Sequence, residues 1–176
     1  MLRRYLLCLY VSLFGLTACT QHSASPSRPV QASIAAGEIG SKLPEFNVKD
    51  LQGREISSAN LRGKVVLIDF WATWCQPCRK EMPGYQRLLD RYGPDGFAVI
   101  GFKFDTMKDT EAPLIFARKI GVRYPLAIAT EEVKQKFGGI EGLPTTLLYD
   151  RNGILRKKVI GFEYAETFDA DLHSLL

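Results

Sequence analysis

The sequence predicts an α/β sandwich in which helices flank a mixed central sheet. The first observation is that two apolar runs, 64–71 and 97–104, have the length and β-branched or aromatic content of buried strands, and helical spacing follows each of them. The second is that two later strand-like runs are joined by Asn152-Gly153, which predicts an antiparallel hairpin. The 176 residues suffice for one domain with a sizeable core plus appendages, and they contain no internal repeat.

The N-terminus has the pattern of a targeting segment. Arg3 and Arg4 precede an apolar run, 5–16, that is too short to span a bilayer and has the length of a signal-peptide core. The run ends in Leu16-Thr17-Ala18-Cys19, which resembles the bacterial lipoprotein box, where cleavage precedes a cysteine that becomes acylated. The alternative is an ordinary cleaved signal with a cysteine nearby. We therefore expect a lipoprotein signal peptide over 1–18, a lipid-anchored flexible tether over 19–38 and a folded domain over 39–176.

Composition supports the tether and limits the partners. Residues 21–37 are rich in Ser, Ala, Pro and Gln and show no apolar periodicity. The formal charge of +4 includes two signal-peptide arginines, so the mature chain carries about +2, and no basic stripe with interleaved aromatics is present. We therefore expect no nucleic-acid partner.

The cysteine count indicates how the thiols are used. Of the 4 cysteines, Cys8 leaves with the signal and Cys19 takes the lipid, so Cys75 and Cys78 remain. Both belong to one C-x-x-C motif, so the domain has no purely structural disulfide to stabilise it, although an extracytoplasmic compartment would permit one.

The first half of the domain contains a hairpin, a strand and a long helix. Gln52-Gly53 predicts the hairpin turn, and 57–61 a short helical turn before the strand over 64–71. The helix after the strand continues to Tyr92, and Pro83 inside it is expected to produce a kink. The apolar side of this helix comprises Met82, Tyr85, Leu88, Leu89 and Tyr92.

The second half alternates strands and helices. After the strand over 97–104 we expect a helix capped by Asp109 or Thr110 and ended by Gly121, then a strand over 126–129 and a helix capped by Thr130. Strands over 145–150 and 154–160 and a final helix complete the domain. The residues expected to face the core are Ile115, Phe116 and Ile120, then Val133 and Phe137, and finally Phe168, Leu172 and Leu175.

The two thiols lie where the strand over 64–71 gives way to the long helix. Unpaired N–H groups and the positive end of the helix dipole favour an anion there, so a cysteine loses its proton more easily. The thiolate is the reactive form of cysteine. Pro77 suits the first turn, where its missing N–H has no cost. This arrangement is typical of a redox-active pair.

The segment W-A-T-W-C-Q-P-C-R-K-E-M-P, residues 71–83, together with G-L-P-T-T at 142–146, resembles the TlpA/ResA-like branch of thioredoxin-fold thiol–disulfide oxidoreductases. The resemblance extends from about Gly40 to the C-terminus. It implies a thioredoxin-like sandwich with an N-terminal hairpin and a central insertion after Phe104. It also implies an enzyme outside the bacterial cytoplasmic membrane, with no cofactor beyond the Cys75–Cys78 disulfide.

The resemblance and the residue chemistry assign roles to the thiols and two carboxylates. Cys75 is expected to attack a substrate disulfide and Cys78 to resolve the mixed disulfide. Asp69, within an apolar strand, should have a raised pKa and could act as a base. Thioredoxins carry an aspartate at this spacing, whereas TlpA/ResA-like proteins more often carry asparagine. Glu81 matches the glutamate of ResA-like proteins, and its alternative is a solvated glutamate beside Arg79 and Lys80.

Substrate contacts are expected around the proline loop. The likeness of G-L-P-T-T to the family's cis-proline loop predicts a cis bond before Pro144, although most X-Pro bonds are trans. The backbone of Leu143 would then pair with an extended substrate. Trp74 is expected to cover the cysteine pair, whereas Trp71 is expected in the core. Gln76 and Pro77 should tune the reduction potential.

Three activities are compatible with a C-x-x-C motif in this position. The favoured one is disulfide reduction, with disulfide-containing proteins such as apocytochrome c as substrates and an integral-membrane thiol reductase as electron donor; its direction follows from the resemblance alone. A copper-binding or metallochaperone lipoprotein is disfavoured because only two thiols remain and the two histidines, His22 and His173, lie in the tether and the final helix. A thiol peroxidase is disfavoured because Thr73 has the wrong offset from Cys75. Thr20, following Cys19, favours outer-membrane sorting in a cell with two membranes.

Overall fold

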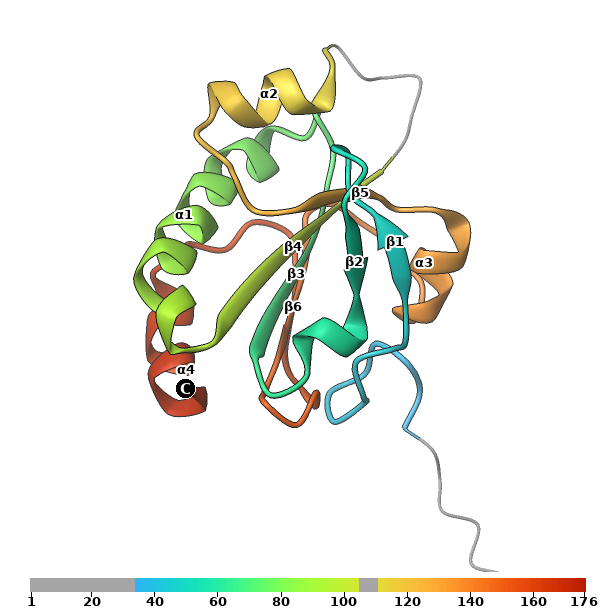
Figure 1. Ribbon diagram of the computed structural model, residues 1–176, viewed down its shortest axis with the longest axis vertical. Helices are drawn as coiled ribbons and strands as arrows, with labels where there is room; N and C mark the ends of the chain where they lie inside the picture. The colour runs from blue at the N-terminus through green and yellow to red at the C-terminus, as the bar shows by residue number, and fades with distance from the viewer. Residues whose placement is uncertain (1–33, 105–110) are drawn as a thin grey trace, which may run out of the picture. The chain divides into compact units, whose positions relative to one another are not determined.

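A computed structural model describes residues 34–104 and 111–176. Its centre is a five-stranded sheet in the order β5-β4-β3-β6-β7 (Figure 1). The strands β3 (Val65–Trp71), β4 (Phe97–Lys103) and β5 (Leu126–Ile128) are parallel. Strand β6 (Thr145–Tyr149) pairs antiparallel with β3, and β7 (Leu155–Ile160) pairs antiparallel with β6 at the edge of the sheet. The predicted mixed sheet is confirmed, and its middle strand is the one that leads into the C-x-x-C motif.

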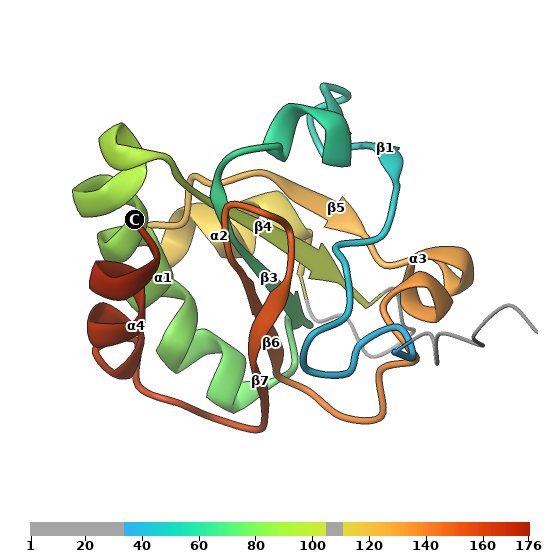
Figure 2. The ribbon, with the colours of Figure 1, turned by 90° about the horizontal axis from the view of Figure 1, so that it is seen from below.

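Helices cover both faces of this sheet. Helices α1 (Gln76–Tyr92), α2 (Pro113–Lys119) and α4 (Thr167–Leu175) lie on one side, and α3 (Glu131–Lys136) lies on the other (Figures 1 and 2). The hairpin of β1 (Asn47–Lys49) and β2 (Glu55–Ser57), with the 3₁₀ turn Ser58–Leu61, joins α3 in covering that second side. The predicted N-terminal hairpin, central insertion and thioredoxin-like sandwich are therefore present.

Strand β3 is buried along its whole length, because both faces of the sheet are covered. Successive side chains point to opposite faces. Leu67 and Trp71 pack into the cluster formed with α1, α2 and α4, whereas Ile68 and Phe70 pack into the cluster formed with α3 and the hairpin. Asp69 lies two residues after Leu67 and two before Trp71, so its side chain is on the same face of the sheet as theirs, the face that α1 covers.

Both hairpins turn around an aspartate whose role the sequence analysis did not identify. Asp50 Oδ1 accepts hydrogen bonds from the backbone N–H groups of Gln52 and Arg54, at 2.9 and 2.8 Å. Asp150 Oδ1 accepts from Asn152 and Ile154 in the same way, both at 2.9 Å. Each turn contains a glycine at positive φ, Gly53 at 83° and Gly153 at 70°. The Asx-type pattern explains why Asp precedes each Gly by three residues.

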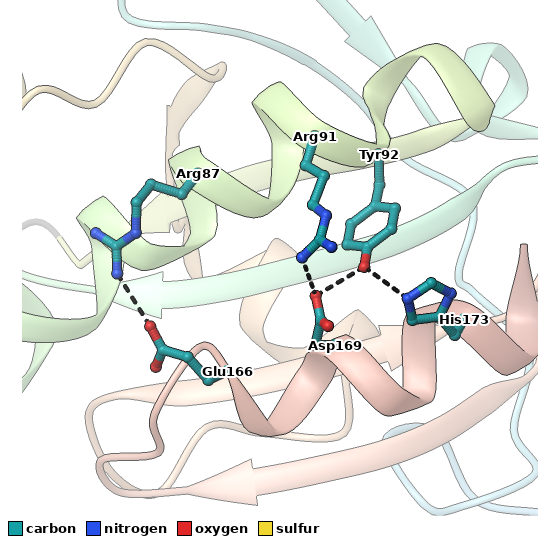
Figure 3. Close-up of polar contacts among 6 residues, drawn as sticks. All are labelled: Arg87, Arg91, Tyr92, Glu166, Asp169 and His173. Atoms are coloured by element: carbon teal, nitrogen blue, oxygen red, sulfur yellow. Dashed lines mark hydrogen bonds and ion pairs between the residues drawn. The ribbon is translucent and has the colours of Figure 1, made fainter.

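The final helix is held against α1 by a polar cluster (Figure 3). The Tyr92 hydroxyl donates to Asp169 Oδ1 at 2.7 Å, and Arg91 reaches the same oxygen at 3.1 Å. His173 Nε2 lies 3.2 Å from the Tyr92 hydroxyl, and Arg87 pairs with Glu166 at 3.2 Å nearer the start of α4. These contacts lie at the rim of the apolar interface and orient α4 along α1.

Two expectations for the helix over 113–119 are wrong. Its N-cap is Ala112, which makes no side-chain hydrogen bond, and not Asp109 or Thr110, which lie outside the described residues. Pro113 follows as the first helical residue, a position that favours proline. Ile115 is 48% exposed and does not face the core, because the short helix turns Phe116 and Ala117 inward. The cap predicted for the next helix is confirmed: Thr130 accepts from the N–H of Val133 at 3.2 Å.

The predicted signal peptide, Cys19 and most of the predicted tether also lie outside the described residues. Within the described part of the chain, no helix has the length and apolarity needed to cross a bilayer.

Candidate active site

The two cysteines lie at the junction of β3 and α1, as predicted. Cys75 and Cys78 form a disulfide, with their Cα atoms 5.3 Å apart. Cys75 is the N-cap of α1, and its Sγ accepts the backbone N–H of Cys78 at 3.3 Å. Pro77 occupies the first turn, so its missing N–H leaves no helical hydrogen bond unmade.

This position favours a thiolate on the first cysteine. The free N–H groups and dipole of the helix N-terminus stabilise negative charge on a capping atom. The Cys75 side chain is 3% exposed, whereas Cys78 is fully buried. An attacking sulfur needs access to its substrate, so the geometry favours Cys75 as the nucleophile and Cys78 as the resolving thiol.

Asp69 is buried without ordinary hydrogen-bond partners. It is completely inaccessible to solvent, and neither carboxylate oxygen has a partner of normal geometry. Burial raises the pKa of Asp69 well above the usual range of an aspartate, while the neighbouring Tyr124 hydroxyl opposes that rise. The direction predicted from the sequence is confirmed.

Glu81 is also buried, so the alternative of a solvated glutamate is wrong. It is 2% exposed; its Oε2 accepts a long hydrogen bond from the N–H of Glu163 at 3.5 Å, and its Oε1 has no partner among the described residues. Burial, and then the charge of Asp69, raise the pKa of Glu81. Its side chain lines a surface hollow of about 360 Å³ between α1 and the segment that leads into α4.

A hydroxyl pair connects the surroundings of the two carboxylates. Tyr85, one turn after Glu81, places its hydroxyl 3.0 Å from Thr146 Oγ1. Thr146 is the direct cross-strand neighbour of Asp69. Tyr85 was predicted only as an apolar position of the helix. The residue type carries a further signal, because a buried tyrosine, unlike a phenylalanine, has a hydroxyl that needs a hydrogen-bond partner.

The predicted cis bond between Leu143 and Pro144 is present. The register pairs Phe70 with Thr145, so this loop lies beside the end of β3 that leads to the cysteines. Thr145 Oγ1 donates to Gly142 O at 2.8 Å, and Pro144 O accepts the N–H of Gly161 at 2.8 Å, which fixes the loop before β6 against the end of β7. Leu143 is half-buried against the cluster that contains both cysteines.

The prediction that Trp71 lies in the core is confirmed, and Trp74 lies partly at the surface. Trp71 is fully buried and stacks on Phe116, with ring centroids 5.3 Å apart. Trp74, next to Cys75, is 38% exposed. Phe162 and Tyr164, which were not predicted as site residues, are two exposed rings in edge contact, with ring centroids 4.8 Å apart, and they line the same hollow as Glu81.

Within residues 34–104 and 111–176, no three His, Cys, Asp or Glu side chains gather as metal ligands. A thioredoxin fold with a disulfide at the N-cap of the helix after its central strand defines the class of thiol–disulfide oxidoreductases.

Comparison with known proteins agrees with this class. The model of the AhpC/TSA family matches residues 39–158. "Thiol-disulfide oxidoreductase ResA" of Bacillus thuringiensis (strain Al Hakam) is 34% identical over 139 residues, which cover 78% of this chain and 79% of that protein. A crystal structure titled "thiol:disulfide interchange protein, thioredoxin family protein from Chlorobium tepidum TLS" has a TM-score of 0.70 at 28% identity and covers 80% of this chain and 99% of its own.

The chain therefore belongs to the AhpC/TSA family and, within it, to the thiol–disulfide oxidoreductases of the ResA type. "Thioredoxin-like protein YneN" of Bacillus subtilis (strain 168), 32% identical over 123 residues, covers 69% of this chain and 71% of its own length.

Proposed function

We propose that the protein is an extracytoplasmic, lipid-anchored reductase of protein disulfides. The observation that carries the proposal is a disulfide at the N-terminus of α1, together with two buried carboxylates, Asp69 on the strand that leads into the motif and Glu81 three residues after Cys78. The disulfide is the only redox group that this chemistry requires, so no cofactor is needed.

In the reduced enzyme, the thiolate of Cys75 attacks a substrate disulfide. A mixed disulfide forms between Cys75 and the substrate, and the first substrate sulfur leaves as a thiolate that takes up a proton. Cys78 then loses its proton and attacks Cys75 Sγ, which releases the second substrate sulfur and regenerates the Cys75–Cys78 disulfide. Two electrons pass from enzyme to substrate; because Cys75 reacts as a thiolate, one of the two protons on the product thiols comes from Cys78 and the other from solvent.

Asp69 and Glu81 are the candidate acceptors for the Cys78 proton. Both have pKa values raised towards the working range of a general base, because burial disfavours their charged forms. In a single-turnover assay of Asp69→Asn and Glu81→Gln, the variant that has lost the acting base should release its product from the mixed disulfide roughly 10²- to 10⁴-fold more slowly. Unchanged release in both variants would exclude both carboxylates.

Substrate contacts are proposed on the surface around Cys75. Trp74 offers an exposed ring beside the cysteine, and the backbone of Leu143, before cis-Pro144, lies at the end of β6 where an extended chain could add as a strand. A disulfide-containing polypeptide such as apocytochrome c fits this arrangement, and an integral-membrane thiol reductase would return the electrons.

The location is proposed from the N-terminal sequence. Cleavage before Cys19 and acylation of its thiol would hold the domain near a membrane surface through residues 19–38. Labelling cells with a fatty-acid analogue should tag the wild type and leave Cys19→Ser unlabelled and released from the membrane fraction. Label that persists in Cys19→Ser would overturn the anchor.

Trapping tests the activity itself. Reduced Cys78→Ser protein should accumulate a mixed disulfide with a model protein disulfide through Cys75, and Cys75→Ser should accumulate none. The reduction potential tests the direction: a value near the ~−270 mV of thioredoxin supports a reductant, and one near the ~−120 mV of DsbA contradicts it.

A further inference from the structure

Asp69 lies opposite a glycine that makes room for a tyrosine. In the register of β3 and β4 its partner is Gly101. A Cβ at this position would lie 2.6 Å from Leu126 Cδ2, 2.9 Å from Trp71 Nε1 and 3.2 Å from Tyr124 Cε2. The missing side chain therefore lets the ring of Tyr124, from the segment before β5, lie against the β4 backbone directly beside Asp69.

Tyr124 is buried, at 3% exposed, and its hydroxyl lacks an ordinary hydrogen-bond partner among the described residues. It nevertheless interacts with the Asp69 carboxyl closely enough to act on its pKa, and burial followed by the Asp69 charge raises the pKa of Tyr124 itself. A buried hydroxyl without a partner is costly, a carboxylate is a strong acceptor, and both oxygens of Asp69 also lack a hydrogen-bond partner among the described residues.

We propose that Tyr124 is a positioning residue for Asp69, and that its hydroxyl donates a hydrogen bond to the ionised carboxylate when Asp69 acts as the base for Cys78. The inference rests on the proposed function for its catalytic meaning, because Asp69 must be ionised to accept the Cys78 proton. The contact itself is independent of that role.

The surroundings of Asp69 explain why one donor matters. From α1, Tyr85 and Glu81 act on the same region, and a charged Glu81 opposes ionisation of Asp69. From β4, Lys103 lies on the same face of the sheet, one alternate position after Gly101, and is 1% exposed. Among these groups, the Tyr124 hydroxyl is the one that acts on Asp69 as a hydrogen-bond partner.

The test is Tyr124→Phe, which removes the hydroxyl and keeps the ring that packs on Gly101. Tyr149→Phe is the matched control, because Tyr149 is also buried, its hydroxyl likewise has no partner among the described residues, and it packs in the cluster on the other face of the sheet. The direct readout is the carboxyl ¹³C NMR titration of Asp69 in the oxidised protein, assigned with Asp69→Asn.

Tyr124→Phe should raise the titration midpoint of Asp69 by about one to two pH units, the size expected for a lost hydrogen bond to a charged group. The pH at which Cys78 resolves a preformed mixed disulfide should move up equally, and Tyr149→Phe should change neither. An unmoved Asp69 titration, or an equal shift in the Tyr149 control, would overturn the proposal. A shifted titration with unchanged release would support the contact and instead refute Asp69 as the base.

Discussion

Replacing Asp69 with asparagine should stabilise the oxidised protein at neutral pH. The carboxyl is fully buried without an ordinary hydrogen-bond partner, so the folded state holds it neutral at a pH where the unfolded chain has already ionised it. Below the unfolded pKa both states are neutral and there is no penalty. As pH rises above that value the unfolded state is favoured, until Asp69 also ionises in the folded protein.

The magnitude follows from proton linkage. One group that is neutral when folded and ionised when unfolded lowers the free energy of unfolding by about 1.4 kcal/mol per pH unit. Between pH 5 and pH 7 the wild type should therefore lose about 3 kcal/mol through Asp69. An asparagine side chain cannot ionise, so in Asp69→Asn this part of the pH dependence should disappear, and the part due to Glu81, whose pKa is also raised, should remain.

Urea unfolding of the disulfide-bonded protein, followed by tryptophan fluorescence at pH 5, 6, 7 and 8, measures the effect. Asp95→Asn is the control, because Asp95 is an exposed carboxylate at the far end of α1. If Asp69→Asn retained the wild-type slope of unfolding free energy against pH, Asp69 would be charged in the folded protein, and the reasoning from burial would fail.

Two further predictions concern packing and turns. Gly84→Ala would place a Cβ 2.4 Å from the Cβ of Ala165, so it should lower the free energy of unfolding by roughly 1–3 kcal/mol in thermal or urea unfolding. Gly93→Ala is the control and should change stability little, because its Cβ would meet a flexible side chain at 3.5 Å. For Asp50 and Asp150, burial acts to raise the pKa, but backbone and arginine hydrogen bonds outweigh it and lower the pKa. The stabilisation from each carboxylate is present above its unfolded pKa and is lost as pH falls through its lower folded pKa. Asp150→Asn should therefore unfold at a higher pH than the wild type in an acid titration. An unchanged midpoint pH would show that the turn does not depend on that charge.

Much of the fold was predictable because its elements are locally encoded. Strand β3 is a continuous apolar run, α3 begins at a capping threonine, and the hairpin of β6 and β7 turns at Asn152-Gly153. The start of α2 was missed because Pro113 competes with the polar caps considered. Ile115 was misplaced because a helix of two turns gives too few positions to fix its buried side.

The site was predictable only where its chemistry depends on neighbours in sequence. Cys75, Cys78 and Asp69 follow from one strand-to-helix junction. The contact between Tyr124 and Asp69 depends instead on strand register, since Gly101 must lie opposite Asp69 before the space for the ring exists. Periodicity on one strand carries no information about which residue of another strand it will meet.

The distribution of unpaired polar atoms supports a functional reason for this arrangement. Among the described residues, the buried side-chain atoms without a partner include both Asp69 oxygens, Trp71 Nε1, Glu81 Oε1 and the Tyr124 hydroxyl, and only the hydroxyls of Ser41 and Tyr149 lie elsewhere. Buried polar groups are ordinarily paired, so a concentration of exceptions around the C-x-x-C motif and the strand pair beside it calls for an explanation. A core selected only for stability would replace Asp69 with an apolar or amide side chain. Above the pKa that Asp69 has in the unfolded chain, an ionisable group there lowers stability, so its retention points to a step in which a proton must move, and we propose resolution by Cys78 as that step.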